Sequence, residues 1–277
     1  MIKLQNLSAG YSTKHPVLHE LNTTLHVGRI YGLLGANGSG KTTLLKTISG
    51  SIAPLSGELS AMGETPKERS VAFLSEMIYL PDEVQLPSMS AKTFEKLYAP
   101  LRPQFSAEKF HDYLQRFEVD TNIRLNRLSL GNRKKFFIAF AMACNAKLLI
   151  FDEPTNGLDI LGKKVFRQLL AAEINDERTI IVSTHLVSDL ESLISDVIVI
   201  KDHNIVLNAD VNTIAERLEF GNANAITTPI YKDGLRAIGK GDGEPTNVDL
   251  EMLYLALHDN SVNQQIIDLV SGKEELC

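Results

Sequence analysis

Tryptophan is absent from this chain of 277 residues, and cysteine occurs only twice, as Cys144 and Cys277. Two cysteines cannot build the disulfide framework of a small secreted domain, so we expect a reducing compartment, with Cys144 in the core and Cys277 at a frayed terminus. The sequence also lacks a run of about eighteen apolar residues and the pattern of a signal peptide. We therefore expect a soluble protein whose work at a membrane would need a partner.

An excess of positive charge is missing too. The 28 Lys and Arg residues are outnumbered by 34 Asp and Glu residues, which gives a net charge of −6. This balance argues against a broad nucleic-acid-binding surface, although it leaves room for a local basic patch, and no nucleic-acid partner is expected. The hydrophobic share of 44% is ordinary and sufficient for a sizeable core, in one large domain or two modest ones.

One glycine-rich stretch carries most of the functional information. It fits the pattern Gly, four residues, Gly, Lys, then Ser or Thr, and lies between a predicted strand over 29–34 and a predicted helix over 42–49. The glycines let backbone N–H groups point at an anion, and the helix N-terminus favours negative charge. We predict that nucleotide phosphates bind here, with Lys41 as a catalytic cation and Thr42 as a Mg²⁺ ligand. The predicted phosphate-binding residues are Gly35, Ala36, Asn37, Gly38, Ser39, Gly40, Lys41, Thr42 and Thr43.

Two further predicted strands end in polar residues. The apolar run over 147–151 ends in Asp152-Glu153, and the run over 179–184 ends in His185. In an open parallel sheet the carboxyl ends of strands share one edge, where sites form. We expect Asp152 to hold Mg²⁺, Glu153 to accept a proton from the attacking water, and His185 to contact the γ-phosphate or fix that water. The alternatives are a solvated strand end and an ordinary satisfied histidine.

Alternating strands and helices predict an α/β fold with a mainly parallel sheet. The glycine-rich stretch over 35–43 indicates that this fold is of the phosphate-loop NTPase class. Two alternating strands over 2–7 and 17–27 add an antiparallel β piece, and 196–208 reads as a hairpin. Late in the chain, 239–245 reads as a flexible turn, and an amphipathic helix is expected to start at Asn247. The expected domains are 1–220, with a helical insert at about 86–146, and 221–277, a small α+β extension.

The order of the motifs resembles that of the nucleotide-binding subunit of an ATP-binding cassette (ABC) transporter, over roughly residues 1–215. The family's signature corresponds to Leu128-Ser129-Leu130-Gly131-Asn132, with Leu130 and Asn132 departing from Leu-Ser-Gly-Gly-Gln. The Asp-Glu-Pro strand end, a dimer-contact loop at 157–159 and the switch histidine follow in order. Arg133, Lys134 and Lys135, just after the signature, are interpreted as a solvated charged patch.

The resemblance implies ATP and Mg²⁺ as cofactors and a head-to-tail dimer with a second ABC subunit, identical or different. Each ATP would lie between one phosphate loop and Ser129 and Gly131 of the other subunit, while Tyr11 would stack on adenine unless it is a plain surface tyrosine. The family's loop glutamine is missing, and Asp82, or secondly Glu76, is the candidate for its position, where a carboxylate could bind Mg²⁺ or water.

The function implied is that of an exporter-type ATPase subunit that drives a separate membrane permease. The protein would then be cytoplasmic and peripheral on the inner face of the cell membrane. A non-transport ABC ATPase acting on nucleic acid or ribosomes is the alternative, although no long coiled coil, second cassette or basic extension is present. A GTPase or kinase is a third possibility, but the Asn-Lys-x-Asp guanine motif is absent.

Overall fold

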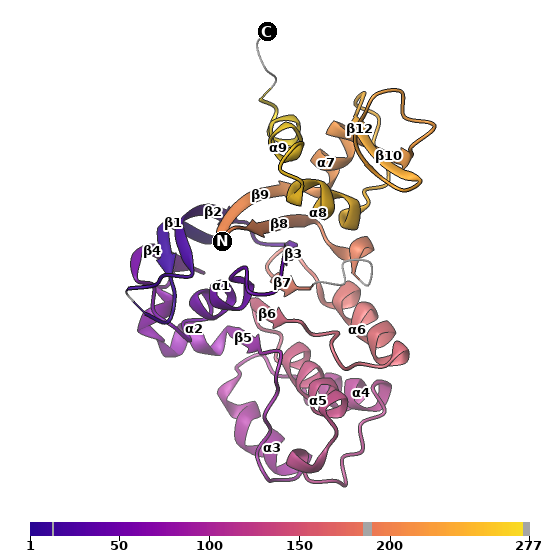
Figure 1. Ribbon diagram of the computed structural model, residues 1–277. Coiled ribbons are helices and arrows are strands. Elements are labelled where there is room, and N and C mark those ends of the chain that lie inside the picture. The colour runs from indigo at the N-terminus through magenta and orange to yellow at the C-terminus, as the bar shows by residue number, and fades with distance from the viewer. Residues whose placement is uncertain (13, 185–189, 274–277) are drawn as a thin grey trace.

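The computed structural model of the chain describes residues 1–12, 14–184 and 190–273 (Figure 1). The predicted His185 and Cys277 lie outside these described residues. The strands are β1 (Ile2–Ala9), β2 (Leu18–Leu25), β3 (Ile30–Gly35), β4 (Ser56–Ala61), β5 (Met77–Leu80), β6 (Leu148–Asp152), β7 (Thr179–Ser183), β8 (Asp196–Lys201), β9 (Asn204–Asp210), β10 (Leu218–Asn222), β11 (Pro229–Asp233) and β12 (Arg236–Lys240). The α-helices are α1 (Lys41–Ile48), α2 (Val71–Ser75), α3 (Ala91–Tyr98), α4 (Ala107–Arg116), α5 (Leu130–Ala143), α6 (Ile160–Glu173), α7 (Val211–Arg217), α8 (Leu250–His258) and α9 (Asn263–Ser271).

The central sheet has the strand order β5-β6-β7-β3-β8-β9. Its pairs are parallel except for β8 with β9, which form the predicted hairpin. Alternate side chains of β6 enter different cores: Leu149 and Phe151 pack on one side of the sheet, and Leu148 and Ile150 on the other. A sheet covered on both faces needs continuous apolar strands, which is why these strands read as unbroken apolar runs. The predicted α/β class is confirmed.

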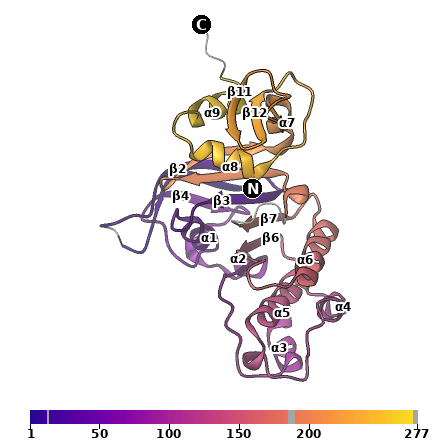
Figure 2. The same cartoon turned by 45° about the vertical axis from the view of Figure 1, so that its right-hand side comes forward.

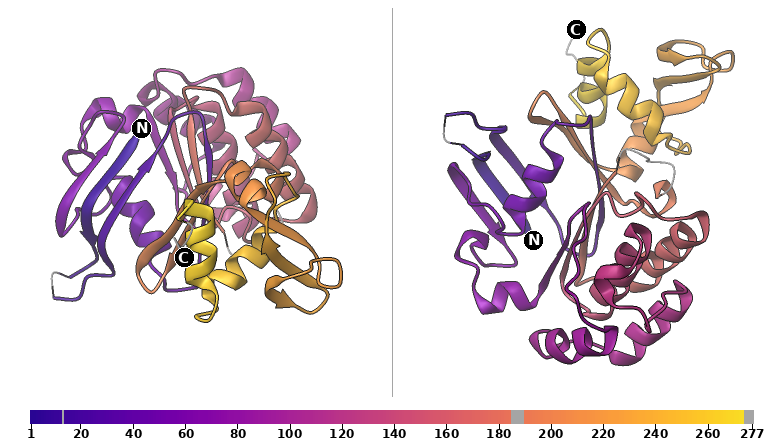
Figure 3. Two further views of the ribbon diagram at one scale, coloured as in Figure 1. Left: turned by 90° about the horizontal axis from the view of Figure 1, so that it is seen from above. Right: turned by 60° about the horizontal axis from the view of Figure 1, so that its bottom comes forward.

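An antiparallel sheet in the order β2-β1-β4 covers one side of the central sheet together with α1. Figure 3 shows this indigo and violet layer on one side and helices α3 to α6 on the other. Leu4 of β1 and Leu45 of α1 are buried in the same cluster as Leu33 of β3. The N-terminal β piece therefore supports the strand that leads into the glycine-rich turn.

Helices α3, α4 and α5 form the insert predicted for 86–146. Figure 2 shows them at the end of the molecule opposite the C-terminal region. Four phenylalanines, Phe94, Phe110, Phe136 and Phe140, meet edge to face with ring centroids between 5.1 and 5.7 Å apart. Such pairs add specificity to apolar burial, so the insert has a well-packed core of its own.

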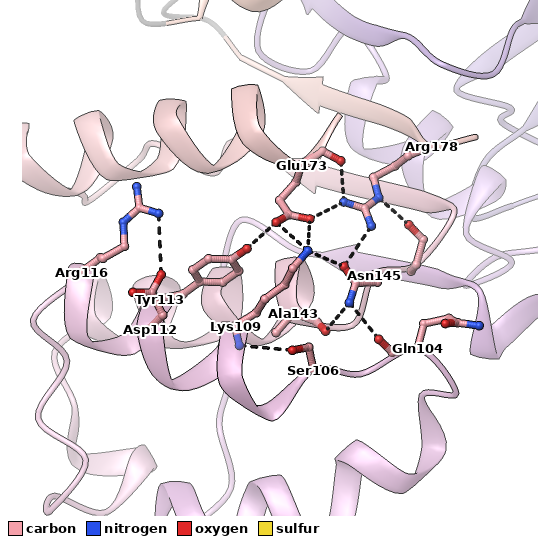
Figure 4. A network of polar contacts seen from close by, with 11 residues as sticks. Gln104, Ser106, Lys109, Asp112, Tyr113, Arg116, Ala143, Asn145, Glu173 and Arg178 are labelled. Atoms are coloured by element: carbon pink, nitrogen blue, oxygen red, sulfur yellow. Dashed lines mark hydrogen bonds and ion pairs between the residues drawn. The ribbon is translucent and has the colours of Figure 1, made fainter. Parts of the chain in front are cut away.

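A buried ionic network joins the insert to the main body (Figure 4). Glu173, at the end of α6, accepts hydrogen bonds from Lys109 and Tyr113 of α4 and from Arg178 just before β7. Lys109 Nζ also reaches the side-chain oxygen of Asn145 at 3.0 Å. Burial alone would raise the pKa of Glu173, but these hydrogen bonds outweigh burial and hold that pKa below its usual value.

The C-terminal region contains the small sheet β10-β12-β11 and helices α7, α8 and α9. Two local predictions here are wrong. Helix α8 is capped by Asp249, whose carboxylate accepts from the N–H of Met252 at 2.8 Å, and does not start at Asn247. Gly239 and Lys240 belong to β12, because pairing with β10 extends them. The expected boundary at residue 220 falls inside β10, and the division into domains stays a prediction.

The region docks on the sheet through Lys201, the last residue of β8. Its ammonium donates to the carbonyl of Leu257 and to the side chain of Asn260, at 3.2 and 2.6 Å. Helix α6 begins at Ile160, where the side chain of Asp159 caps it by accepting from the N–H of Gly162 at 2.9 Å. Within the described ranges, no helix has both the length and the apolar character needed to cross a membrane.

Candidate nucleotide-binding site

The glycine-rich turn lies between β3 and α1, as predicted. Gly40 has a φ of 109° directly before the first residue of α1, a conformation that side chains with a Cβ rarely adopt. A Cβ on Gly40 would also stand 2.5 Å from a methyl carbon of Leu18 in β2. Glycine is therefore required at this position for the turn to bend into the helix.

Lys41 is held over the turn by backbone oxygens. Its ammonium donates to the carbonyls of Gly35 at 2.7 Å and Ala36 at 3.2 Å, and the residue is only 7% exposed. Burial lowers the pKa of Lys41, while the nearby charges of Glu153 and Asp152 act in the opposite direction. A buried cation with two neutral partners leaves a strong preference for an anion.

The turn opens into a pocket of about 360 Å³ that also contains the predicted carboxylates. Among the described residues, the buried hydroxyl of Ser39 finds no hydrogen-bond partner, so the turn does not satisfy all of its own polar groups. The lining residues are Tyr11, Val17, Ala36, Asn37, Gly38, Gly40, Lys41, Thr42, Thr43, Asp82, Asp152 and Glu153.

Asp152 is fixed at the end of β6. It is 1% exposed, and its carboxylate accepts from the hydroxyl of Ser183 at 2.6 Å and from that of Tyr79 at 3.3 Å. Burial and the neighbouring Asp152 raise the pKa of Tyr79, which keeps the phenol neutral and able to donate. Thr42 lines the same pocket with an exposed side chain. One hydroxyl and one carboxylate, with phosphate oxygens and water, fit the oxygen ligands that Mg²⁺ prefers.

Glu153 lies one residue further and has an unusual backbone. Its φ is 48°, in the left-handed region that non-glycine residues rarely occupy. Its N–H donates to the carbonyl and to the hydroxyl of Ser183, at 3.2 and 3.0 Å. Its carbonyl accepts from Lys134 of α5 at 2.9 Å. Contacts from two other elements thus hold Glu153 in this conformation beside the pocket.

Asp82 and Glu76 lie at opposite ends of β5, which favours the first of the two candidates for the missing glutamine. Asp82 follows the carboxyl end of β5 and lines the nucleotide pocket. Glu76 precedes β5 and lines a separate pocket with Lys147, at the other edge of the sheet. The carboxylate of Asp82 accepts from Lys134 at 3.0 Å.

The structure does not bring the signature residues into this pocket. Ser129 is exposed and caps α5 by accepting from the N–H of Asn132 at 3.3 Å. Gly131 packs against the loop over 157–159: a Cβ on Gly131 would stand 2.5 Å from the carbonyl oxygen of Gly157. Tyr11, 65% exposed, does line the pocket, and its ring lies 5.6 Å from the ammonium of Lys46.

Sequence reasoning missed three residues that support the carboxylates: Tyr79, Ser183 and Lys134. The solvated patch predicted for 133–135 is wrong, since Lys134 is 1% and Lys135 9% exposed. The signal was helical spacing: Lys134 precedes Ile138 by four residues and so shares its buried face.

A parallel sheet with a glycine-rich turn, a buried lysine and an acidic strand end defines a phosphate-loop nucleotide-binding protein. Comparison with known proteins narrows this class. A sequence model of the family described as "ABC transporter" matches residues 18–156, and the chain belongs to this family. It is an ABC transporter ATP-binding domain, an ATPase.

Two curated relatives are each 30% identical to the chain. The bacitracin transport ATP-binding protein BcrA of Bacillus licheniformis aligns over 98% of both chains. The ABC transporter ATP-binding protein YtrB of Bacillus subtilis aligns over 78% of this chain and 74% of its own length. The lantibiotic transport ATP-binding protein SrtF of Streptococcus pyogenes is 28% identical over 79% of this chain and 94% of its own.

Solved structures agree on the fold. An ATP-binding subunit of an ABC transporter superposes with a TM-score of 0.70 at 23% identity, over 77% of this chain and 91% of that one. The ATP-binding cassette MJ0796, solved as a dimer in a post-hydrolysis state with ADP and Pi, gives a TM-score of 0.64 at 23% identity. It covers 76% of this chain and 98% of that chain.

Proposed function

We propose that this chain hydrolyses ATP to drive a separate membrane permease, through ATP-dependent head-to-tail dimerisation, in the export of an unidentified substrate. The names of BcrA and SrtF, which describe transport of bacitracin and of a lantibiotic, support a transport role. They do not favour the alternative of an ABC ATPase that acts on nucleic acid or ribosomes. The chain would then lie on the cytoplasmic face of the cell membrane, attached through the permease.

The pocket supplies the groups that hydrolysis needs. Lys41 and the backbone of the turn would bind the β- and γ-phosphates, and Tyr11 would stack on adenine. Mg²⁺ held by Thr42 and Asp152, with Asp82 as a further candidate, would neutralise the charge of the phosphates. Glu153 would take the proton of the attacking water. His185, outside the described residues, stays the candidate for contact with the γ-phosphate.

One observation carries the dimer: Ser129, the cap of an anion-favouring helix end, is exposed and outside the pocket of its own chain. A helix N-terminus with an exposed cap can bind a phosphate. We do not expect an ATP bound in this chain's own pocket to reach Ser129. A second subunit facing head to tail would present its own nucleotide to Ser129 and Gly131. Binding of ATP would then join the two subunits, and hydrolysis would release them.

The test uses Glu153→Gln, which should still bind MgATP and keep the γ-phosphate in place. We expect turnover to fall by roughly 10²–10⁴-fold and a stable dimer to form with MgATP but not with MgADP, as measured by size-exclusion chromatography with light scattering. Ser129→Arg in the same background should abolish the dimer without weakening binding of ATP to the monomer. A Glu153→Gln variant that hydrolyses ATP at the normal rate would exclude Glu153 as the base.

Co-purification tests the transport role. When the chain is expressed together with the products of its neighbouring genes and purified in detergent, a hydrophobic integral membrane protein should co-purify with it. Isolation with ribosomes or nucleic acid instead would favour the non-transport alternative.

We also propose that residues 221–277 pack onto the core as an extension. The buried apolar face of α8, including Leu250 and Leu253, belongs to the same cluster as Val197 and Val199 of the central sheet. Truncation before Gly221 should therefore lower stability and solubility, and an unchanged melting temperature would exclude a packing role.

A further inference from the structure

The buried side chain of Lys134 is unexplained by phosphate binding. It extends from α5, the helix that the signature opens, and is 1% exposed. Its ammonium makes two contacts to different loops: the carbonyl oxygen of Glu153 at 2.9 Å and a carboxylate oxygen of Asp82 at 3.0 Å. A lysine this deeply buried is costly unless it is paired and hydrogen-bonded, so both contacts are strongly held.

The first contact fixes the main chain of the expected base. Glu153 occupies the left-handed region at a φ of 48°, which persists only where the surroundings hold it. Its N–H is tied to Ser183 of β7, and its carbonyl is tied to Lys134. Loss of the lysine contact would remove one of these two hydrogen-bonded anchors of the Glu153 main chain and let the side chain of Glu153 leave its place beside the pocket.

The second contact connects the signature helix to the loop after β5. Asp82 lines the nucleotide pocket, and its side chain is 49% exposed, so it faces the pocket on one side and Lys134 on the other. Asn156 approaches the same carboxylate oxygen at 3.5 Å. A single ammonium thus joins α5, the loop after β5 and the loop after β6.

We propose that Lys134 is a positioning residue for hydrolysis, which holds Glu153 in its productive orientation and ties that orientation to the seating of the signature helix. The inference depends on the proposed ATPase role of Glu153. When α5 docks on the partner subunit's nucleotide, Lys134 couples the position of α5 to that of the Glu153 main chain. Hydrolysis is thereby favoured in the closed dimer.

The experiment measures steady-state ATPase activity of the full chain. Lys134→Met should lower kcat by about 10–100-fold and change KM for MgATP by less than threefold, because misplacement of a catalytic group affects the transition state. Lys134→Gln keeps an N–H donor for the Glu153 carbonyl and should restore most of the loss. Lys92→Met, at an exposed position of α3 in the same insert, is the matched control and should match the wild type.

A double-mutant cycle separates positioning from general destabilisation. In the Glu153→Gln background, Lys134→Met should lower the residual turnover by less than threefold, because the side chain that it positions has already lost its function. Three results would each overturn the inference. Lys134→Met could lower turnover equally in the wild-type and Glu153→Gln backgrounds, its MgATP affinity could fall as much as its kcat, or Lys134→Gln could show no recovery of kcat. An inactive wild type would instead contradict the proposed function, and an active wild type with inactive Glu153→Gln but normal Lys134→Met would contradict only this inference.

Discussion

The nucleotide pocket and the network around Glu173 both contain buried charged side chains, but they differ in how these groups are paired. In the network, Glu173 accepts hydrogen bonds from Lys109, Tyr113 and Arg178, so the carboxylate is shared by two cations and every charged group has a partner of opposite sign inside the protein. At the glycine-rich turn, Lys41 donates to the backbone carbonyls of Gly35 and Ala36, and the buried hydroxyl of Ser39 has no hydrogen-bond partner in the described part of the chain. A region whose polar groups satisfy one another stabilises the fold, whereas one whose groups await a partner is built to bind.

The largest expected effect is on nucleotide binding in the pocket. Lys41→Ala removes a buried cation, and the lost charge-assisted hydrogen bonds should cost about 4 kcal/mol, or roughly 1,000-fold in affinity for MgATP. Isothermal titration calorimetry measures this change. The unfolding free energy should change little, and Lys67→Ala, on the exposed surface, is the control. Retained tight binding in Lys41→Ala would refute the phosphate-loop assignment.

Disruption of the network around Glu173 should have the opposite result, namely a loss of stability with little change in nucleotide affinity. Glu173→Gln leaves the buried Arg178, and beside it Lys109, without a counter-charge, and removal of one partner of a buried pair costs about 3 kcal/mol of stability. Denaturant unfolding measures the loss. Affinity for MgATP should stay within twofold, since no group of the network lines the pocket. A large loss of affinity with unchanged stability would show that the comparison is wrong.

The same network predicts a dependence of stability on pH. Because the folded-state pKa of Glu173 lies below its usual value, its contribution is fully present above about pH 4.3, the pKa of an unperturbed glutamate, and is lost as pH falls through the lower folded-state pKa. Wild-type stability should therefore fall more steeply than that of Glu173→Gln as pH is lowered from 5 to about 3. Urea unfolding at each pH measures this difference. If the unfolding free energies of the wild type and Glu173→Gln fall in parallel with pH, Glu173 does not contribute to the loss of stability in acid.

The smallest effect sharpens the comparison at the edge of the network. Ser106 caps α4 by accepting from the N–H of Lys109 at 3.3 Å. Ser106→Ala should cost about 1 kcal/mol by thermal unfolding, less than Glu173→Gln, because only a helix end is affected. A loss as large as that of Glu173→Gln would mean that the cap, and not the ionic pairing, holds α4 in place.

Local chemistry explains which parts of the site could be predicted. The turn over 35–43 and the ends of β6 and β7 depend on residue types at fixed spacing, and the structure places Lys41, Thr42, Asp152 and Glu153 around one pocket. The interpretation of 133–135 as a solvated patch failed because it depends on distant contacts and not on local spacing. Charge along a sequence does not reveal which helix face is buried, and the partners of Lys134 are some twenty and fifty residues away in the chain.

By itself the sequence determined the phosphate loop, the alternation of strands and helices, and the order of the motifs, because these follow from backbone freedom at glycine, apolar periodicity and fixed spacing. Only the tertiary structure decided that Asp82 rather than Glu76 reaches the pocket, that Tyr79 and Ser183 hold Asp152, and that Lys134 lies buried between two loops. These are long-range contacts. Whether a charged side chain is paired or solvated depends on which distant segments the packed sheet brings beside it.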